Sequence, residues 1–317
     1  MREWIMLTPI SVLLALTALS VIVMGAVFAA PYARLNGMTP FESHIVDTTY
    51  RDGHRVGVMQ RNNNPLHLGY TPIGPSWRAG PYALGADAQG RDVASRLLCG
   101  GRNSLMIASA AALLGLTLAT FLSPVRWLCR GGGVERIVSW IMTMLWAVPV
   151  YLFASCLSMT MLRDGLRLGP VTLTADNRLI PVCVIAAVYL PYAARLLTTC
   201  VRQLAQRDYV KIAAAFGASP FTVVVREILP GLLLSLMTFF PLLMALCLLA
   251  ESALSFLSLG VQAPDVSWGS MIRDGEGLIY TRPVVAILPG MMIMLTVLSF
   301  YIVSESCTRV LRRRDMI

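Results

Sequence analysis

The sequence is short of charged residues. Only 14% of its 317 residues are Asp, Glu, Lys or Arg, whereas 56% are hydrophobic, and the mean hydropathy is +0.67. A soluble domain usually carries about 25% charged residues, so this chain has too few to cover a water-facing surface. The apolar residues are gathered in long runs, and a helix needs about 20 of them to cross a bilayer core. A soluble globular protein is therefore excluded, and an integral membrane protein is expected.

Sequence motifs for catalysis are also lacking. The chain has no GxxxxGK[ST] stretch to cradle ATP phosphates, no GxSxG elbow and no HExxH zinc motif. The three histidines, His44, His54 and His67, lie in one polar stretch without the spacing of metal ligands. The seven cysteines form no CxxC pair, and we interpret them as small core residues. We therefore expect no enzyme activity and no cofactor or metal bound by this chain.

Six long apolar runs predict six transmembrane helices. They extend over about Trp4–Ala30, Ser104–Ser123, Ile137–Leu162, the stretch between Arg178 and Val201, Ile228–Ala250 and Val284–Ser304. The predicted organisation is an N-terminal helix over 1–30, a polar loop over 31–103, a membrane core over 104–308 containing a cytoplasmic loop over 202–230, and a basic tail over 309–317. The expected fold class is all-α integral membrane.

The first apolar run has a second interpretation, a cleaved secretory signal. Its apolar stretch is longer than the roughly 7–15 residues of a typical signal core, and it is preceded by Arg2 and Glu3 rather than by a basic cluster. We favour an uncleaved transmembrane helix.

The basic residues are distributed unequally between the two sides of the predicted helices. The net charge is +9, and Lys211 is the only lysine. The ends and short loops on one side hold Arg2, Arg126, Arg130, Arg136, Arg195, Arg202, Arg207, Lys211, Arg226, Arg309, Arg312, Arg313 and Arg314, whereas the short loops on the other side hold Arg163, Arg167, Arg178, Arg273 and Arg282. Positive residues accumulate in cytoplasmic loops, so both termini and the 202–230 loop are predicted to be cytoplasmic. Membrane topology thus explains the basic balance better than nucleic-acid binding does.

The predicted spans hold almost no ionisable residues. Glu251 and Glu305 lie only at the ends of apolar runs. Ion-coupled secondary carriers tend to place such residues inside their spans, so this class is a less favoured alternative. Energy is expected to enter through a partner that docks on the cytoplasmic loop.

That loop has a recognisable pattern. It reads DYVKIAAAFGASP over Asp208–Pro220 and REILP over Arg226–Pro230. The pattern resembles the EAA loop of binding-protein-dependent ABC permeases, in which two short helices flank a glycine before the next span. Gly217 permits the turn between them. Lys211–Ala213 stands where the family usually has Glu-Ala-Ala, and Ala214 replaces a common arginine.

Other segments extend the resemblance to residues 84–310. The stretch LGADAQGRDVASR over Leu84–Arg96 is similar to the segment before the second span of C-type subunits of dipeptide, oligopeptide and nickel permeases. ESALSFLSLGVQ over Glu251–Gln262, followed by Ser267–Gly269, resembles the segment after the fifth span of the same subunits. Leu288–Phe300 is similar to their last span.

The resemblance implies a multi-pass subunit of the bacterial inner membrane with the type I ABC importer permease fold. Such a subunit moves cargo by alternating access, and dipeptides or oligopeptides are the expected cargo. Nickel, glutathione and other small solutes stay open as alternatives. The implied partners are a second homologous permease subunit, two ATPase subunits that bind ATP and Mg, and a periplasmic or lipid-anchored substrate-binding protein. Contact with membrane lipid is expected, and contact with nucleic acid is not.

Two groups of candidate site residues follow from the resemblance. The ATPase-coupling candidates are Tyr209, Lys211, Ala213, Ala214, Gly217, Ala218, Ser219 and Pro220. The periplasmic-side and gate candidates are Asp87, Arg91, Asp92, Arg96, Glu251 and Trp268.

Each periplasmic-side candidate has a structural alternative to its functional role. The charged residues over Asp87–Arg96 are expected just outside the second span, either in contact with a partner subunit or in ion pairs within their loop, where exposed pairs contribute only about 0–1 kcal/mol each. Glu251 is expected near the outer mouth, either as an amine-binding gate or as a helix-end residue. Trp268 is expected either to anchor the chain at the membrane interface, which we favour, or to serve as a platform for the substrate.

Overall fold

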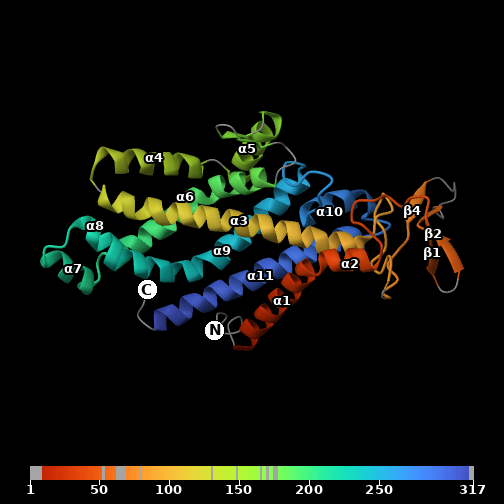
Figure 1. Cartoon of the computed structure of the whole chain (residues 1–317), viewed down its shortest axis with the longest axis horizontal. Coiled ribbons are helices and arrows are strands. Elements are labelled where there is room, and N and C mark those ends of the chain that lie inside the picture. The colour runs from red at the N-terminus through yellow and green to blue at the C-terminus, as the bar shows by residue number, and fades with distance from the viewer. Residues whose placement is uncertain are drawn as a thin grey trace.

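The computed structural model describes residues 9–51, 54–61, 69–78, 80–129, 131–147, 149–164, 166–168, 171–173 and 178–313, and helices dominate it (Figure 1). The α-helices are α1 Pro9–Val27, α2 Ala29–Leu35, α3 Val93–Leu128, α4 Gly133–Ala147, α5 Val150–Asp164, α6 Leu179–Leu204, α7 Asp208–Ala215, α8 Pro220–Val223, α9 Leu229–Phe256, α10 Trp268–Gly275 and α11 Val284–Arg313. A π-helical turn, η2 Val224–Ile228, joins α8 to α9, and a 3₁₀ turn, η3 Glu276–Leu278, follows α10.

In the part of the chain that the structure describes, six short strands form three antiparallel hairpins. Their bounds are β1 Thr48–Arg51, β2 His54–Gly57, β3 Met59–Arg61, β4 Tyr70–Pro72, β5 Leu166–Leu168 and β6 Val171–Leu173. The pairs are β1 with β2, β3 with β4 and β5 with β6. The polar segment predicted as a loop over 31–103 therefore contains two hairpins as well as α2.

The core lies where α3, α6 and α9 pack against one another, with α11 and α1 along one side (Figure 1). Helix α3 buries a row of small residues spaced three or four apart, including Ala108, Ala111, Ala112 and Ala119. Small side chains let neighbouring helices approach closely, which is how helices associate in a bilayer without a hydrophobic driving force. The small residues of α3 thus set its close packing against α6.

The expectation of a helical membrane protein is confirmed. Within the described residues, five helical segments are long and apolar enough to cross a membrane: Pro9–Val27, Val93–Leu128, Leu179–Leu204, Pro220–Phe256 and Val284–Leu311. The predicted span over Ile137–Leu162 differs, because the structure divides it into α4 and α5 on either side of Pro149. Proline lacks an N–H and clashes with the preceding helical turn, which accounts for the break. The count of six spans and the cytoplasmic position of the termini stay predictions.

Helix α3 is longer than the span predicted over Ser104–Ser123. Helix α3 begins at Val93 rather than at Ser104, and Asp92 caps it by accepting a hydrogen bond from the Ser95 N–H at 2.8 Å. Arg96 therefore belongs to the first turn of a long helix rather than to a turn outside it. A charged residue is tolerated there because carboxylates from other segments neutralise it within the fold.

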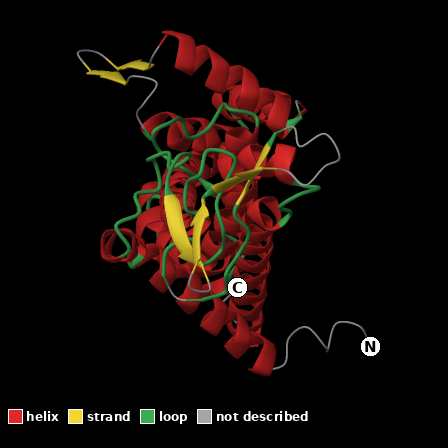
Figure 2. Cartoon of the chain, turned by 90° about the vertical axis from the view of Figure 1, so that its right-hand side faces the viewer, coloured by secondary structure: helices red, strands yellow, loops and turns green. Residues whose placement is uncertain are grey.

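The helices connect two different ends of the molecule. In Figure 1, α7, α8 and the last turns of α11 lie at one end, which we call the α7 end, whereas α10 and the hairpins formed by β1–β4 lie at the other, the α10 end. Figure 2 views the molecule from the α10 end, where loops and strands cover the helices. The two groups of candidate residues are therefore separated by the length of the helices.

Candidate functional site

At the α7 end, α7 and α8 form a short helix-turn-helix between α6 and α9. Gly217 turns the chain with a φ of 85°, a conformation that glycine adopts without steric cost. Ser219 then caps α8 by accepting a hydrogen bond from the Thr222 N–H at 3.2 Å, and Pro220 occupies the first helical position. The small residues predicted as coupling candidates thus build one compact turn, which we call the coupling turn (residues 208–223).

The coupling turn presents an apolar outer surface. The side chains of Tyr209, Ile212, Phe216 and Phe221 are all exposed, and Phe216 reaches 89% exposure. On the inner face, residues such as Val210 are buried against the core. Exposed apolar groups gathered on one feature are typical of a protein–protein contact.

The structure brings all the predicted coupling residues together on this turn. Tyr209, Lys211, Ala214, Gly217, Ser219 and Pro220 are exposed, and Ala213 and Ala218 are half-buried. Lys211 forms an exposed ion pair with Asp208 at 3.5 Å. Sequence reasoning missed Phe216 and Phe221 as candidate contact residues. Aromatic residues in an otherwise small and polar loop, on either side of its glycine, were the signal that could have identified them.

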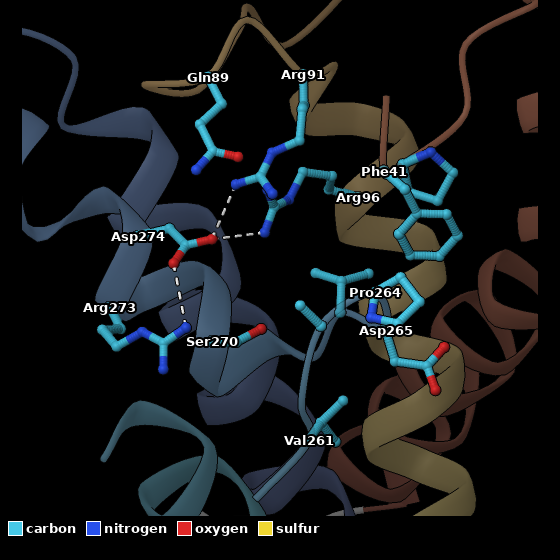
Figure 3. A pocket seen from close by; sticks show the side chains of 13 residues that line it. Phe41, Gln89, Arg91, Arg96, Val261, Pro264, Asp265, Ser270, Arg273 and Asp274 are labelled. Atoms are coloured by element: carbon cyan, nitrogen blue, oxygen red, sulfur yellow. Dashed lines mark hydrogen bonds and ion pairs between the residues drawn. The ribbon is translucent and has the colours of Figure 1, made fainter. Parts of the chain in front are cut away.

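At the α10 end, the charged residues before and within the start of α3 form a buried network. The Asp87 carboxylate accepts hydrogen bonds from Arg91 Nε at 2.7 Å and from Arg96 Nη1 at 2.6 Å. Both guanidinium groups also reach Asp274 Oδ2, Arg91 at 3.0 Å and Arg96 at 2.7 Å. In Figure 3, Arg91 and Arg96 point toward Asp274, and Arg273 lies on the other side of that carboxylate.

The network differs from the exposed ion pairs considered as the structural alternative. Asp87 is 2% exposed and Arg96 is 3% exposed. Asp274 belongs to α10, so the bonds join the start of α3 to a helix far along the chain. Buried charges of this kind need their partners, because a single one left unpaired costs several kcal/mol. The network therefore holds α3 and α10 together.

A pocket of about 390 Å³ opens beside the network. Its walls are formed by Pro40, Phe41, Gln89, Arg91, Arg96, Val261, Ala263, Pro264, Asp265, Val266, Ser270, Arg273 and Asp274 (Figure 3). Asp265, on its rim, accepts two hydrogen bonds from the Arg178 guanidinium at 2.7 and 2.6 Å. This pocket combines guanidinium groups with apolar surface at the end of the molecule where cargo is predicted to arrive.

Asp92 stands apart from the network. Its Oδ2 accepts hydrogen bonds from the backbone N–H and the hydroxyl of Ser95, whereas its buried Oδ1 has no hydrogen-bond partner among the described residues. Burial raises the pKa of the Asp92 carboxyl above its ordinary value of 3.8, and the bonds from Ser95 offset this only in part. Asp92 is thus a capping residue in an apolar setting.

This setting predicts a pH effect on stability. Because the folded-state pKa of Asp92 is raised, the stability that its protonated form contributes is fully present below the unfolded-state pKa and is lost as the pH rises through the folded-state pKa. Asparagine caps helices as well as aspartate and carries no charge. The melting temperature of Asp92→Asn in detergent, measured against pH, should therefore gain on that of the unchanged chain as the pH rises from about 4. A difference that is constant with pH would contradict the assignment.

Glu251 lies in the last turns of α9 and is fully buried. Its carboxylate accepts hydrogen bonds from the Ser255 hydroxyl at 2.7 Å and from the Ser252 hydroxyl at 3.4 Å. Ser255 in turn accepts one from the Val261 N–H at 3.1 Å. The structure gives Glu251 the place near the α10 end that was expected, but surrounds it with serines rather than with an open mouth. Its role as a gate stays a prediction.

Trp268 is buried as well, contrary to the expectation of an interface anchor. Its indole N–H donates to the Leu97 carbonyl at 2.9 Å, and its backbone N–H donates to the Ser104 hydroxyl at 3.1 Å. An interfacial tryptophan has its ring at the level of the lipid headgroups, whereas Trp268 packs inside the chain over Gly101. Together with the ion-pair network it fixes α10 against α3.

The contact between α10 and α9 depends on a glycine next to this tryptophan. A Cβ added to Gly269 would lie 2.1 Å from the backbone oxygen of Ser252, so the two helices would have to separate. Gly269→Ala should therefore destabilise the protein by about 1–3 kcal/mol, the usual cost of overpacking. Gly277→Ala is the matched control, because no atom lies within 4 Å of its added Cβ. Equal melting temperatures for the two variants would contradict this packing.

No group of three or more potential metal-binding side chains occurs in the part of the chain that the structure describes. The arrangement instead offers two features suited to transport: an exposed apolar turn at one end of the helices and a network-braced pocket at the other.

Comparisons with known proteins agree with this arrangement. Residues 104–314 match the family described as binding-protein-dependent transport system inner membrane component. A curated glutathione transport system permease protein, GsiD from Pectobacterium atrosepticum, is 32% identical over 70% of this chain and 69% of its own length. GsiD from Escherichia coli O6:K15:H31 is 31% identical over 73% of this chain and 71% of its own length.

A solved structure supports the fold independently of close sequence similarity. A chain of the MetNI methionine ABC transporter in an inward-facing conformation superposes with a TM-score of 0.54 at 15% identity, covering 69% of this chain and 95% of that chain. At this identity the likeness concerns the fold alone, and the fold is that of a type I ABC importer permease. The family match, the curated relatives and the fold agree: the chain belongs to the binding-protein-dependent transport system inner membrane components and is a permease subunit of an ABC importer of the bacterial inner membrane.

Proposed function

We propose that this subunit is driven by ATP through the coupling turn, which seats in a cleft of a separate ATPase subunit. The observation that carries the proposal is the exposed apolar surface of Tyr209, Ile212, Phe216 and Phe221 on a turn that connects two long helices. Aromatic side chains that fill pockets of a partner dominate the energy of protein interfaces. ATP and Mg would be bound by the ATPase, and this chain would carry out no bond chemistry.

Alternating access would follow from the connection between the coupling turn and the α10 end. Helix α9 runs from η2 to the buried serine cluster around Glu251, and α10 packs against its end. A π-helical turn such as η2 is rare, is a place where helices kink, and is often found at functional sites. Movement of the turn would therefore change the tilt of α9. The turn must bind the ATPase differently in its two states, since equal affinity shifts no equilibrium.

The proposed complex contains this chain, a second homologous permease, two ATPases and a periplasmic or lipid-anchored binding protein. The description of the family, which refers to a binding protein, supports this composition. The α7 end would face the cytoplasm, in agreement with the distribution of arginines. The α10 end, with its pocket, would face the binding protein and receive the cargo.

The proposed cargo is a short peptide. The similarity to permeases named for the transport of glutathione supports this choice, because glutathione is itself a short peptide. Nickel or another small solute carried by the same type of complex is the second candidate. An ATP-independent secondary transporter is the third, and the exposed coupling turn disfavours it.

Co-purification tests the proposal. The full-length tagged chain is isolated from its native membrane, the proteins that accompany it are identified, and cargo uptake is measured in vesicles with and without ATP. Recovery of an ATPase and a second permease, with ATP-dependent uptake of peptides, is the expected result. Recovery of the chain alone, with uptake that needs no ATP, would overturn the proposal in favour of a secondary transporter. ATP-dependent uptake of nickel but not of peptides would overturn only the choice of cargo.

A further inference from the structure

A second pocket lies at the α7 end, between α3, α4 and α6, and none of the proposed transport steps uses it. Its volume is about 280 Å³, and it is lined by Arg126, Trp127, Glu135, Thr198, Arg202, Ala205 and Gln206. We call it the arginine pocket. Its floor is the last turn of α3, and its wall ends at Gln206, just before α7 begins at Asp208.

The arginine pocket carries an excess of positive charge. Among the described residues, Arg126 donates only to neutral hydroxyls, through Nη1 to Thr198 at 3.3 Å and through Nη2 to Ser139 at 2.8 Å. Its Nε–H is buried and has no hydrogen-bond partner among the described residues. A buried polar hydrogen without an acceptor is costly, so this donor points to an acceptor that the described residues do not supply.

The single carboxylate of the pocket does not neutralise both arginines. Glu135 lies 3.6 Å from Arg202 Nη2, which is longer than a hydrogen bond, and it also accepts a bond from the Gly131 N–H at 2.8 Å. Arg126 is close enough to be repelled by the charge of Arg202 and attracted by that of Glu135. Two guanidinium groups thus face one shared carboxylate, and the pocket retains one net positive charge.

The acceptor best suited to these donors is a phosphate. Guanidinium groups present several N–H donors in a plane and bind phosphate oxygens through paired, charge-assisted hydrogen bonds. The pocket lies at the end of a membrane-spanning helix, beside a half-buried tryptophan, which is a residue type enriched at the level of lipid headgroups. Basic pockets between transmembrane helices on the cytoplasmic side bind anionic headgroups.

We propose that the arginine pocket binds the phosphate of an anionic lipid from the inner leaflet. The phosphate accepts from Arg126 Nε and from Arg202, and the acyl chains extend along the apolar surfaces of α3 and α4. Because Ala205 and Gln206 line the pocket, the bound headgroup touches the segment that enters the coupling turn. The bound lipid thereby stabilises the segment that leads into the coupling turn.

The test measures lipid retention by native mass spectrometry. The full-length chain, with whatever partners accompany it, is purified in detergent and supplied with phosphatidylglycerol or with phosphatidylcholine. The unchanged chain should retain phosphatidylglycerol in preference. Arg126→Gln should lower this retention at least about tenfold, which corresponds to losing one charge-assisted hydrogen bond. Arg126→Lys keeps the charge but loses the planar guanidinium group, so its retention of phosphatidylglycerol should lie between those of the unchanged chain and Arg126→Gln.

Arg136→Gln is the matched control, because Arg136 is an exposed arginine on α4 that does not line the pocket. It should retain the lipid as the unchanged chain does. Equal retention by Arg126→Gln would overturn the proposal, as would equal loss in Arg136→Gln. Inorganic phosphate is the second probe: if it binds at the pocket while phosphatidylglycerol is not retained, the lipid source is wrong. If Arg126→Gln loses the ATPase but keeps the lipid, the pocket is instead a protein contact.

Discussion

Changing Gly217 to valine is expected to abolish ATP-driven uptake while leaving the chain in the membrane. Gly217 has a φ of 85°, and no atom lies within 4 Å of an added Cβ, so the substitution acts through backbone strain alone. The left-handed region costs an ordinary residue roughly 1–2 kcal/mol, and a β-branched side chain is disfavoured there still more strongly. The chain relieves this strain by reshaping the turn, which displaces Phe216 and Phe221 from their positions. ATPase recovered with the purified chain should fall at least about tenfold.

Gly131→Val separates the coupling role from strain. Gly131 also has a positive φ, 79°, and open space around its Cβ position, but it lies before α4 and outside the coupling turn. Both variants carry the same kind of strain, and their melting temperatures in detergent should fall by similar amounts. Only Gly217→Val should lose the ATPase and the uptake of peptides by proteoliposomes. If Gly217→Val recovers as much ATPase as Gly131→Val, the coupling turn is not the docking element.

Changing Asp87 to alanine is expected to cause the largest loss of stability. The Asp87 carboxylate accepts from the guanidinium groups of both Arg91 and Arg96 and from the backbone N–H of Arg91 at 3.0 Å. Its removal leaves Asp274 as the only carboxylate in the described part of the chain that is bonded to the two arginines, of which Arg96 is almost fully buried. Breaking a buried ion pair by removing one partner costs about 3–5 kcal/mol. Thermal unfolding of the detergent-purified chain should therefore occur at a clearly lower temperature, with reduced yield from membranes.

Asp265→Ala is the control for this effect. Asp265 also bonds an arginine through two oxygens, but the Arg178 side chain is 43% exposed. Exposed pairs contribute only about 0–1 kcal/mol, so this variant should unfold close to the unchanged chain. If the two variants lowered the unfolding temperature by similar amounts, burial would not determine how much an ion pair contributes to stability.

The membrane class and most of the spans could be predicted from the sequence, because a run of about 20 apolar residues is typical of a helix that crosses a bilayer. The break at Pro149 was missed, since apolar composition continues through it and hydropathy does not register a missing N–H. The start of α3 was missed for the opposite reason. The predicted span begins at Ser104 because the charge-free run begins there, just after Arg102. Only the folded chain supplies the carboxylate of Asp274 that pairs with Arg96 inside the helix.

The candidate residues show the same division. The coupling turn is local, so its residues could be recognised together from one stretch of sequence around Gly217. The surroundings of Trp268 are not local, because it bonds to Leu97 and Ser104 on a helix far earlier in the chain. Which side of a helix faces the interior depends on such partners, and a single sequence does not reveal them. The arginine pocket likewise depends on α3 and α6 lying side by side.

The length of α9 has a mechanical consequence. Its 28 residues form one continuous α-helix, with Pro241 in its interior, from the π-helical turn η2 to the contact with α10. At 1.5 Å per residue this is a lever of about 42 Å, so a rotation of one degree about η2 would sweep its far end through roughly 0.7 Å. A rotation of a few degrees about η2 would displace the far end of α9 by more than closely packed side chains can absorb without rearranging. In the proposed alternating access, a small rotation at η2 would therefore be enough to shift the contact between α9 and α10.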